Sequence, residues 1–180
     1  TIDVLVNNAG ITRDRMFLKM SREDWDAVIE TNLNSMFNVT KQVVADMVEK
    51  GWGRIINIAS VHGLVGSPNK SAYVAAKHGI VGMTKVIALE NAKTGVTCNA
   101  ICPGWIMTGM ADAAFAAAAD PDAAKADALA RHPAGRFGEP SDIAAMATWL
   151  ASDESGFATG QLFTIDGGMT AASPLNPGLF

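Results

Sequence analysis

The 180-residue sequence predicts an α/β fold in which helices cover both faces of a doubly wound parallel sheet. Two observations support this prediction. Short apolar runs with strand character alternate with longer segments of helical periodicity along the chain. The middle runs are apolar at consecutive positions instead of every second one, as expected for strands that are buried on both faces of a sheet.

The first fifty residues predict a strand followed by a long helical region. Residues 2–6, Ile-Asp-Val-Leu-Val, form a short apolar run that ends in a tight turn. Ser21 followed by Asp24 is typical of a helix start with an acidic first turn. The helical pattern continues to Gly51, but residues 31–34, Thr-Asn-Leu-Asn, are a poor helix interior, so we expect a break or bend there.

The rest of the chain repeats the alternation of strand and helix. Residues 111–130 are rich in alanine and have strong helix propensity, but their low complexity favours a mobile cover over a core element. The other predicted elements are a strand at 54–59, a helix at about 71–92, a strand at 96–101, a helix at about 140–151 and a strand at 161–165.

Composition and charge narrow the class of protein. Hydrophobic residues make up 49% and charged residues 18%, which predicts a single globular domain over residues 1–180. The net charge of −4 offers no basic footprint for nucleic acid, and no apolar run approaches the roughly 20 residues of a membrane span. The chain opens on a predicted strand, so we expect no signal peptide, and on Thr1 instead of methionine, so we do not expect a native start.

Cys98 and Cys102 lie on one predicted strand. Four residues of strand span roughly 13 Å, whereas a disulfide needs Cα atoms within about 7 Å. We therefore expect free buried thiols and a reducing, cytoplasmic location. We predict no metal site.

Three side chains around the second strand suggest acid–base chemistry. Ser60 closes that strand, and Tyr73, the only tyrosine, lies with Lys77 in the helix that follows. Residues four apart share a helix face, so the lysine ammonium can lie beside the phenol and lower its pKa. Such a set suits proton transfer to or from an alcohol or carbonyl oxygen. A Tyr-x-x-x-Lys pair alone also occurs by chance in many helices, so this interpretation depends on the other motifs.

Further candidate residues follow the neighbouring strands. Residues 7–10, Asn-Asn-Ala-Gly, come after the first strand, and Pro103 and Gly104 come after the third. Ligands of parallel α/β sheets bind beyond the carboxyl ends of the strands. The sequence therefore predicts a ligand site formed by these turns together with Ser60.

Taken in order, these motifs resemble the short-chain dehydrogenase/reductase family over all 180 residues. The resemblance implies a Rossmann-like fold, NAD or NADP as cofactor, and hydride transfer between nicotinamide C4 and a carbonyl or alcohol carbon of a small-molecule substrate. The matching residues are Asn7-Asn8-Ala9-Gly10, then Asn32, Ser60, Tyr73 and Lys77 in tetrad order, then Pro103-Gly104 with Thr108, and finally Asp166-Gly167-Gly168.

The resemblance also implies residue roles. Tyr73 is the general acid/base, Ser60 positions the substrate oxygen, and Lys77 lowers the tyrosine pKa and binds the nicotinamide ribose. Asn32 holds a water that relays protons to Lys77; the alternative is that Asn32 is only a helix irregularity. The implied cofactor-binding residues are Asn7, Ala9, Gly10, Tyr73, Lys77, Pro103, Gly104, Ile106 and Thr108.

Two subfamilies share the resemblance. Residues 1–60 look most like acetoacetyl-CoA reductases and 3-oxoacyl-carrier-protein reductases, whereas residues 61–105 look most like 3-hydroxybutyrate dehydrogenases. Both readings imply a four-carbon 3-oxo or 3-hydroxy acyl substrate.

The dehydrogenase resemblance implies a small carboxylate pocket lined by His62, Lys70 and Trp105. A glutamine that contributes to that pocket in the subfamily is replaced here by Ile11-Thr12. The alternatives are a surface charge for Lys70 and loop packing for His62 and Trp105.

One departure from the family pattern concerns the nucleotide. The family begins with a strand and a glycine-rich turn that binds the pyrophosphate, but no GxxxGxG occurs here, and the chain corresponds to strands 4–7 of the pattern. Two hypotheses follow: an active oxidoreductase whose missing half comes from another segment, or a non-catalytic fragment or structural subunit. The family also implies a homodimer or homotetramer, formed through the helices at about 32–50 and 71–92.

Overall fold

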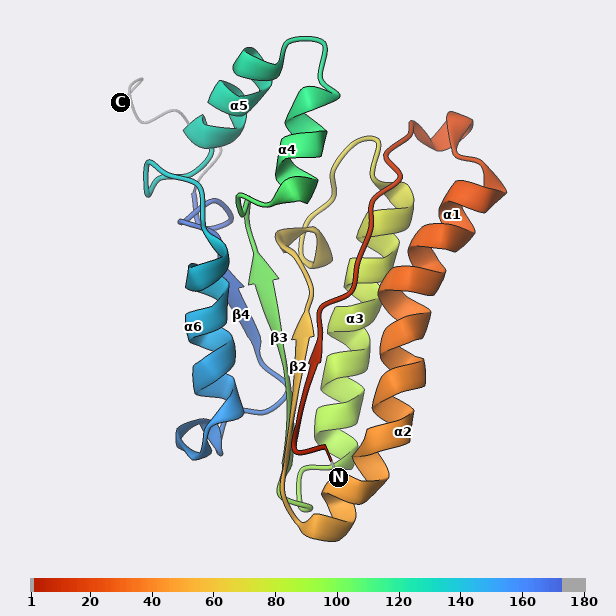
Figure 1. Cartoon of the computed structure of the whole chain (residues 1–180), viewed down its shortest axis with the longest axis vertical. Coiled ribbons are helices and arrows are strands. Elements are labelled where there is room, and N and C mark those ends of the chain that lie inside the picture. The colour runs from red at the N-terminus through yellow and green to blue at the C-terminus, as the bar shows by residue number, and fades with distance from the viewer. Residues whose placement is uncertain (1, 173–180) are drawn as a thin grey trace.

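A computed structural model describes residues 2–172 as a parallel sheet with helices on both faces (Figure 1). The predicted α/β fold is thereby confirmed. The strands pair in the order β1-β2-β3-β4, and their bounds are β1 Val4–Asn7, β2 Gly53–Ile58, β3 Val96–Pro103 and β4 Leu162–Ile165. The α-helices are α1 Arg22–Ile29, α2 Ser35–Lys50, α3 Ser71–Glu90, α4 Gly109–Ala116, α5 Pro121–Ala130 and α6 Pro140–Ala151.

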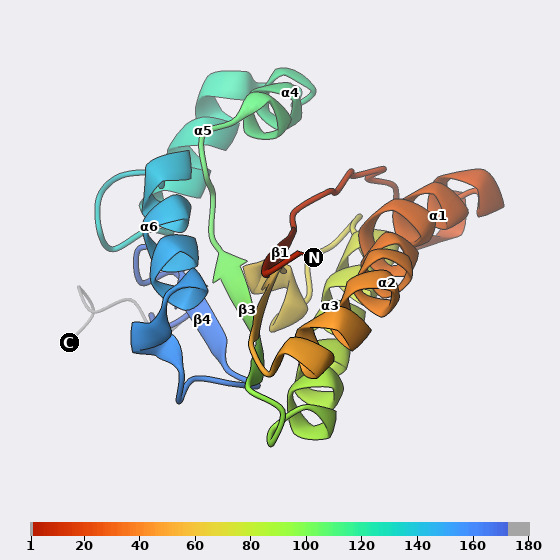
Figure 2. The ribbon, with the colours of Figure 1, turned by 60° about the horizontal axis from the view of Figure 1, so that its bottom comes forward.

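The central strands are buried on both faces because helices cover each side (Figure 2). On β2, Ile55 packs against Met47 of α2 and Ala88 of α3. The next residue, Ile56, packs on the opposite face against Leu150 of α6. Successive strand residues point to opposite faces, so burial of both faces requires an unbroken apolar run, which is the pattern found in the sequence.

Strand β1 is covered on one face only. Leu5 packs into the cluster beneath α2 and α3, but the exposed fractions of Val4 and Val6 are 36% and 46%. Within the described residues β1 pairs only with β2, so the other edge of the strand is open. An open apolar edge favours association with another strand.

The long helical region is a pair of helices joined by a π-helical turn. The Ser21 side chain accepts a hydrogen bond from Asp24 N at 3.0 Å and caps α1, as predicted. Residues Glu30–Asn34 form the π turn that links α1 to α2, which confirms the predicted irregularity. The chain remains helical there, and the wider turn buries Asn32 at 2% exposure. Gly51 ends α2 in the left-handed conformation.

The alanine-rich segment corrects one expectation. It forms two helices, α4 and α5, because Asp120 caps the second one and Pro121 occupies its first turn. Ala111, Phe115 and Ala128 form a buried apolar cluster of their own. The prediction that this segment is not a core element was therefore wrong: it has a small core, located beyond the carboxyl ends of the strands (Figure 1).

The two cysteines are both buried and free, as their positions on one strand predict. Burial raises the pKa of Cys98 to about 12, so this group remains a thiol at neutral pH. Within residues 2–172, none of the helices is long and apolar enough to cross a bilayer. The same residues contain no group of three His, Cys, Asp or Glu side chains arranged to hold a metal ion.

Candidate active site

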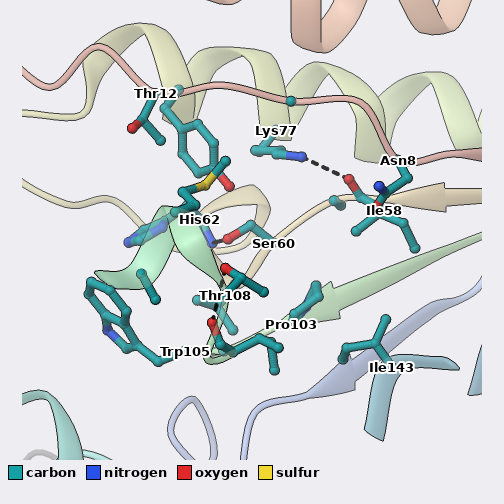
Figure 3. A pocket seen from close by; sticks show the side chains of 18 of the residues that line it. Asn8, Thr12, Ile58, Ser60, His62, Lys77, Pro103, Trp105, Thr108 and Ile143 are labelled. Atoms are coloured by element: carbon teal, nitrogen blue, oxygen red, sulfur yellow. Dashed lines mark hydrogen bonds between the residues drawn. The ribbon is translucent and has the colours of Figure 1, made fainter. Parts of the chain in front are cut away.

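A pocket of about 630 Å³ lies where β1, β2 and β3 end (Figure 3). This volume falls in the usual range for a small-molecule site. The segments after all three strands contribute to it, as expected for a parallel sheet. Of the predicted site residues, those that line the pocket are Ala9, Gly10, Ser60, His62, Lys70, Tyr73, Lys77, Pro103, Gly104, Trp105, Ile106 and Thr108.

Asn7 is outside the pocket lining. Its side-chain amide donates to Thr40 Oγ1 at 3.0 Å and to Asn57 Oδ1 at 2.8 Å, so it ties β1 to α2 and β2. This geometry gives the Asn7 side chain a role in the scaffold, so a contact between Asn7 and the cofactor stays a prediction for its backbone groups only. The next residue, Asn8, lines the pocket. It belongs to the predicted ligand-site turn at residues 7–10, although it is not among the implied cofactor-binding residues.

Asn32 also lies behind the pocket lining. Its side-chain oxygen accepts from Ile11 N at 2.8 Å, and its amide donates to Ile11 O at 3.0 Å. A Cβ added at Gly10 would lie 3.6 Å from Asn32 Oδ1 and 3.8 Å from Lys77 Nζ. Asn32 therefore fixes the segment after β1 beside the lysine, and it is more than a helix irregularity.

Ser60 and Tyr73 lie on the wall formed by β2 and α3. Ser60 is buried at the end of β2, and its hydroxyl accepts from His62 N at 3.1 Å (Figure 3). Burial raises the pKa of Tyr73, and a hydrogen bond with the Ser60 hydroxyl opposes that shift. The structure thus corrects the expectation of a lowered tyrosine pKa, since burial outweighs the neighbouring groups.

Lys77 lies on the same face of α3 as Tyr73, as the spacing predicts. Its Nζ is 5.4 Å from the centre of the Tyr73 ring and donates to Ile58 O at 2.8 Å (Figure 3). Burial lowers the pKa of Lys77 to about 8. At pH 7 the side chain is therefore mostly protonated, and its charge is directed at the end of β2.

The loop after β3 is held tightly against the loop after β4. A Cβ at Gly104 would lie 2.9 Å from Asp166 Cα, so only glycine fits there without a shift. Asp166 accepts hydrogen bonds from Gly168 N at 2.9 Å and from Thr170 N at 2.7 Å. The predicted Asp-Gly-Gly turn therefore supports the pocket from outside.

His132 is a buried residue that sequence reasoning missed. Its Nδ1 lies 2.8 Å from Ala128 O, and its Nε2 accepts from Trp105 N at 3.3 Å, so it joins α5 to the loop after β3. The Trp105 ring stacks on Phe115 with 4.8 Å between ring centres. Trp105 thus lines the pocket and also packs in the small core, and its contact with a substrate carboxylate stays a prediction.

His62 and Lys70 border the tyrosine. The His62 ring meets the Tyr73 ring edge-on at 5.9 Å, and burial, with Lys70 nearby, lowers the His62 pKa. Lys70 Nζ lies 5.8 Å from the Tyr73 ring centre and forms an ion pair with Asp14. The exposed fraction of the Lys70 side chain is only 18%, so Lys70 is not a free surface charge.

The donor set fits the nicotinamide ribose half of a dinucleotide. Hydroxyls of Ser60, Tyr73 and Thr108 and the ammonium of Lys77 all belong to pocket-lining residues. Gly10 leaves space beside Lys77 Nζ that any Cβ would occupy. The 180 residues contain no glycine-rich turn for the pyrophosphate, so the fit covers this half of the nucleotide only.

Comparison with known proteins agrees with this geometry. The family model described as enoyl-(acyl carrier protein) reductase matches residues 1–170. The chain is 49% identical over 168 residues to the acetoacetyl-CoA reductase of Cupriavidus necator, covering 93% of this chain and 66% of that protein. It is 46% identical over 175 residues to the D-beta-hydroxybutyrate dehydrogenase of the same organism, covering 94% and 68%.

A solved structure shows the same architecture. It is a protein of Agrobacterium tumefaciens described as a candidate 2-deoxy-d-gluconate 3-dehydrogenase with bound NADP, with a TM-score of 0.89 and 39% identity. The match covers 94% of this chain and 68% of the solved one. The Rossmann-like fold is thereby confirmed. The chain spans only part of its relatives, 66% of the length of the acetoacetyl-CoA reductase. Both subfamilies expected from the sequence occur among its relatives, and the chain belongs to the short-chain dehydrogenase/reductase family.

Proposed function

We propose that this protein is an NAD(P)-dependent oxidoreductase that transfers hydride between nicotinamide and a 3-oxo or 3-hydroxy acyl substrate. The observation that carries the proposal is the convergence of Ser60, Tyr73 and Lys77 on one wall of the pocket. Two relatives, an acetoacetyl-CoA reductase and a D-beta-hydroxybutyrate dehydrogenase, support this substrate class by their names.

Tyr73 acts as the general acid when the carbonyl is reduced. Because burial raises its pKa, the phenol is protonated at neutral pH and has a proton to give to the substrate oxygen. The Ser60 hydroxyl, beside that phenol, positions the same oxygen. A bound reduced nicotinamide would supply the hydride to the carbonyl carbon, and the reverse reaction uses the same groups.

Lys77 and Asn32 hold the cofactor side of this wall. The Lys77 ammonium is charged at neutral pH and reaches the space that Gly10 leaves open, where it would bind ribose hydroxyls. Asn32 fixes Ile11 through both backbone groups and lies beside the same space. Its amide oxygen keeps a second lone pair, which could hold a water that returns protons to Lys77.

The opposite wall would orient the nicotinamide carboxamide through backbone groups at Pro103, Gly104 and Ile106. This segment is fixed because Gly138 N donates to Trp105 O and Met107 N donates to Gly138 O, each at 2.9 Å. The Thr108 hydroxyl precedes α4 and would contact the pyrophosphate, and Ala9 and Gly10 would border the nicotinamide.

The remaining half of the nucleotide site requires a further segment. We propose that a strand with a glycine-rich turn pairs with the open edge of β1, next to Val4 and Val6, whose exposed fractions are 36% and 46%. Without such a segment, the chain would be the alternative stated above, a non-catalytic fragment or structural subunit.

The first experiment titrates the 180-residue chain with NADH and NADPH by nicotinamide fluorescence and measures acetoacetyl-CoA reduction. The same assays are applied to this chain fused behind the part of the Cupriavidus necator reductase that precedes the matched region. We expect saturable binding and turnover in the fusion. A folded fusion that binds neither nucleotide, or binds without turnover, would overturn the proposal.

We also propose a homodimer or homotetramer in the cytoplasm. The exposed fractions of Phe37 on α2 and Leu89 on α3 are 52% and 78%, and such apolar side chains suit a subunit interface. Free buried thiols at Cys98 and Cys102 are compatible with a reducing compartment. Sedimentation equilibrium tests the assembly, and a monomer at micromolar concentration would contradict it.

A further inference from the structure

The ion pair between Lys70 and Asp14 lies at the substrate side of the pocket. Lys70 lines the pocket, and its ammonium donates to Asp14 Oδ2. The pair joins two distant segments, the loop after β1 and the start of α3. It therefore sets the charge of the pocket wall next to Tyr73.

The backbone holds Asp14 in this position. Arg15 N donates to Asn69 O at 2.8 Å, and Arg15 and Lys70 form an isolated parallel bridge. Asn69 adopts the left-handed conformation with φ of 66°, which turns the chain toward this contact. Asp14 thus faces Lys70 because of main-chain pairing, and the ion pair does not depend on two free surface side chains meeting.

Neighbouring charges do not compete for Asp14. Arg13 and Arg15 lie 3.9 and 3.7 Å from Asp24, which is the carboxylate they pair with. The second oxygen of Asp14, Oδ1, is buried without a hydrogen-bond partner among the described residues. Within residues 2–172, Lys70 is therefore the one cation paired with the Asp14 carboxylate, and this pair already balances the charge of the Lys70 ammonium.

The other titratable groups of the pocket lining leave no spare cation near the substrate. Burial lowers the pKa of His62, which favours its neutral form. The Lys77 ammonium is bound to Ile58 O at the cofactor side. Among the described residues that line the pocket, the titratable groups are Lys70, Tyr73, His62 and Lys77.

We propose that Asp14 neutralises Lys70 and thereby makes the pocket select an uncharged acyl group, such as a thioester, over a free carboxylate. A substrate carboxylate beside Lys70 would have to displace Asp14 or lie next to a second negative charge, and both are unfavourable in a partly buried site. The inference rests on the proposed function for the substrate class and assigns Asp14 as a specificity-determining, positioning residue.

The test compares two probes that differ mainly in charge, acetoacetate and its neutral methyl ester. Calorimetric titration of the 180-residue chain measures their dissociation constants. In Asp14→Asn the carboxylate is lost and Lys70 is free to bind an anion, so acetoacetate affinity should rise by about tenfold or more. Affinity for methyl acetoacetate should change less than about twofold, because the ester makes no ion pair.

Three further variants complete the design. Asp26→Asn removes an exposed carboxylate of α1 that pairs with Arg22, and it should leave both affinities unchanged. Asp14→Glu keeps the charge and should keep the parent preference. Lys70→Met in the Asp14→Asn background should abolish the gain, because the anion then loses its partner.

Several results would overturn the proposal. One is an Asp14→Asn variant that gains no acetoacetate affinity, or gains equally for the ester. Another is a single variant Lys70→Met, with Asp14 intact, that weakens acetoacetate binding more than ester binding. This measurement remains valid if Asp14→Asn does not fold. Binding is measured without turnover, so the role of Asp14 is decided separately from the proposed function, which failure of the fusion protein to oxidise NADH or NADPH would reject.

Discussion

The two walls of the pocket are built in different ways. The wall from β2 and α3 carries Ser60, Tyr73 and Lys77 and is continuous with the main core of the sheet. The opposite wall, from the loop after β3 and α4, carries Trp105 and Met110, is largely apolar, and rests on a small cluster that α4 shares with α5. Figure 1 shows this second wall as a separate pair of helices beyond the strand ends.

The difference follows from how many side chains each helix buries. Helix α3 buries seven residues, namely Ala72, Ala76, Lys77, Ile80, Val81, Thr84 and Ala88. In α4 and α5 the buried residues are Ala111, Phe115 and Ala128. Groups that transfer protons need fixed positions, whereas a wall that admits substrate needs only local packing. We therefore expect the α4–α5 wall to open at a lower free energy than the α3 wall.

The largest expected effect is a loss of activity on changing the wall from β2 and α3, called the fixed wall below. Tyr73→Phe removes the proton donor but keeps the ring, so acetoacetyl-CoA reduction by the fusion protein should fall by about 10²- to 10⁴-fold. Nucleotide affinity and the free energy of unfolding should stay close to those of the parent, and they serve as controls for folding. A rate within a few-fold of the parent would exclude Tyr73 as the general acid/base.

Asn32→Ala should lower the stability of the fold beside the same wall. The change removes two hydrogen bonds and leaves the backbone N–H and C=O of Ile11 without their partner, which should lower the free energy of unfolding by about 2–3 kcal/mol. Urea unfolding measures the loss. Asn34→Ala is the matched control, because its amide bonds Glu30 on the exposed surface of the same turn and should change stability by about 0.5 kcal/mol or less. Equal losses in both variants would contradict a special role for Asn32.

Much of the fixed wall could be predicted from the sequence because its signals are local. The end of an apolar strand placed Ser60, and a spacing of four along one helix placed Tyr73 and Lys77 on one face. The irregular composition near Asn32 predicted a break or bend in the helix, and the structure has a π turn there although the chain remains helical.

What the sequence could not show depends on packing between distant segments. The pKa of Tyr73 is raised instead of lowered because burial decides it, and burial depth cannot be read from spacing. The Lys70–Asp14 pair joins residues 56 apart, and no local pattern predicts it.

The division of the alanine-rich segment did have a local signal, since Asp120 followed by Pro121 is a helix start.

Lys77→Met should stabilise the fold at neutral pH. The pKa of Lys77 is lowered to about 8 in the folded protein, below its ordinary value of 10.5, so the unfolded chain binds more protons between these two values. Stability from this group therefore rises with pH across that window, and the full penalty of burying the charge is present below it. The variant should be more stable than the parent by roughly 1–3 kcal/mol at pH 7, with the difference vanishing toward pH 10.5.

Urea unfolding of Lys77→Met and parent at several pH values measures that difference directly. The exposed Lys85 of the same helix supplies the control, because Lys85→Met removes a charge that is not buried and should leave the pH dependence of stability unchanged. A difference between Lys77→Met and parent that does not vary with pH would show that packing, and not the buried charge, controls the stability of this position.

The smallest expected effect is on the wall of α4 and α5. Phe115→Ala removes the ring that stacks on Trp105 at 4.8 Å, but the cluster lies outside the main core. Global unfolding should change by about 1 kcal/mol, less than the 3–5 kcal/mol typical of a core phenylalanine. The KM for acetoacetyl-CoA should rise several-fold with kcat nearly unchanged, and amide hydrogen exchange should quicken in α4 and α5 only. Phe157→Ala, which removes a fully exposed ring, should alter neither quantity. A loss of stability as large as that of a core phenylalanine, with faster exchange in α3 as well, would show that the two walls unfold as one unit.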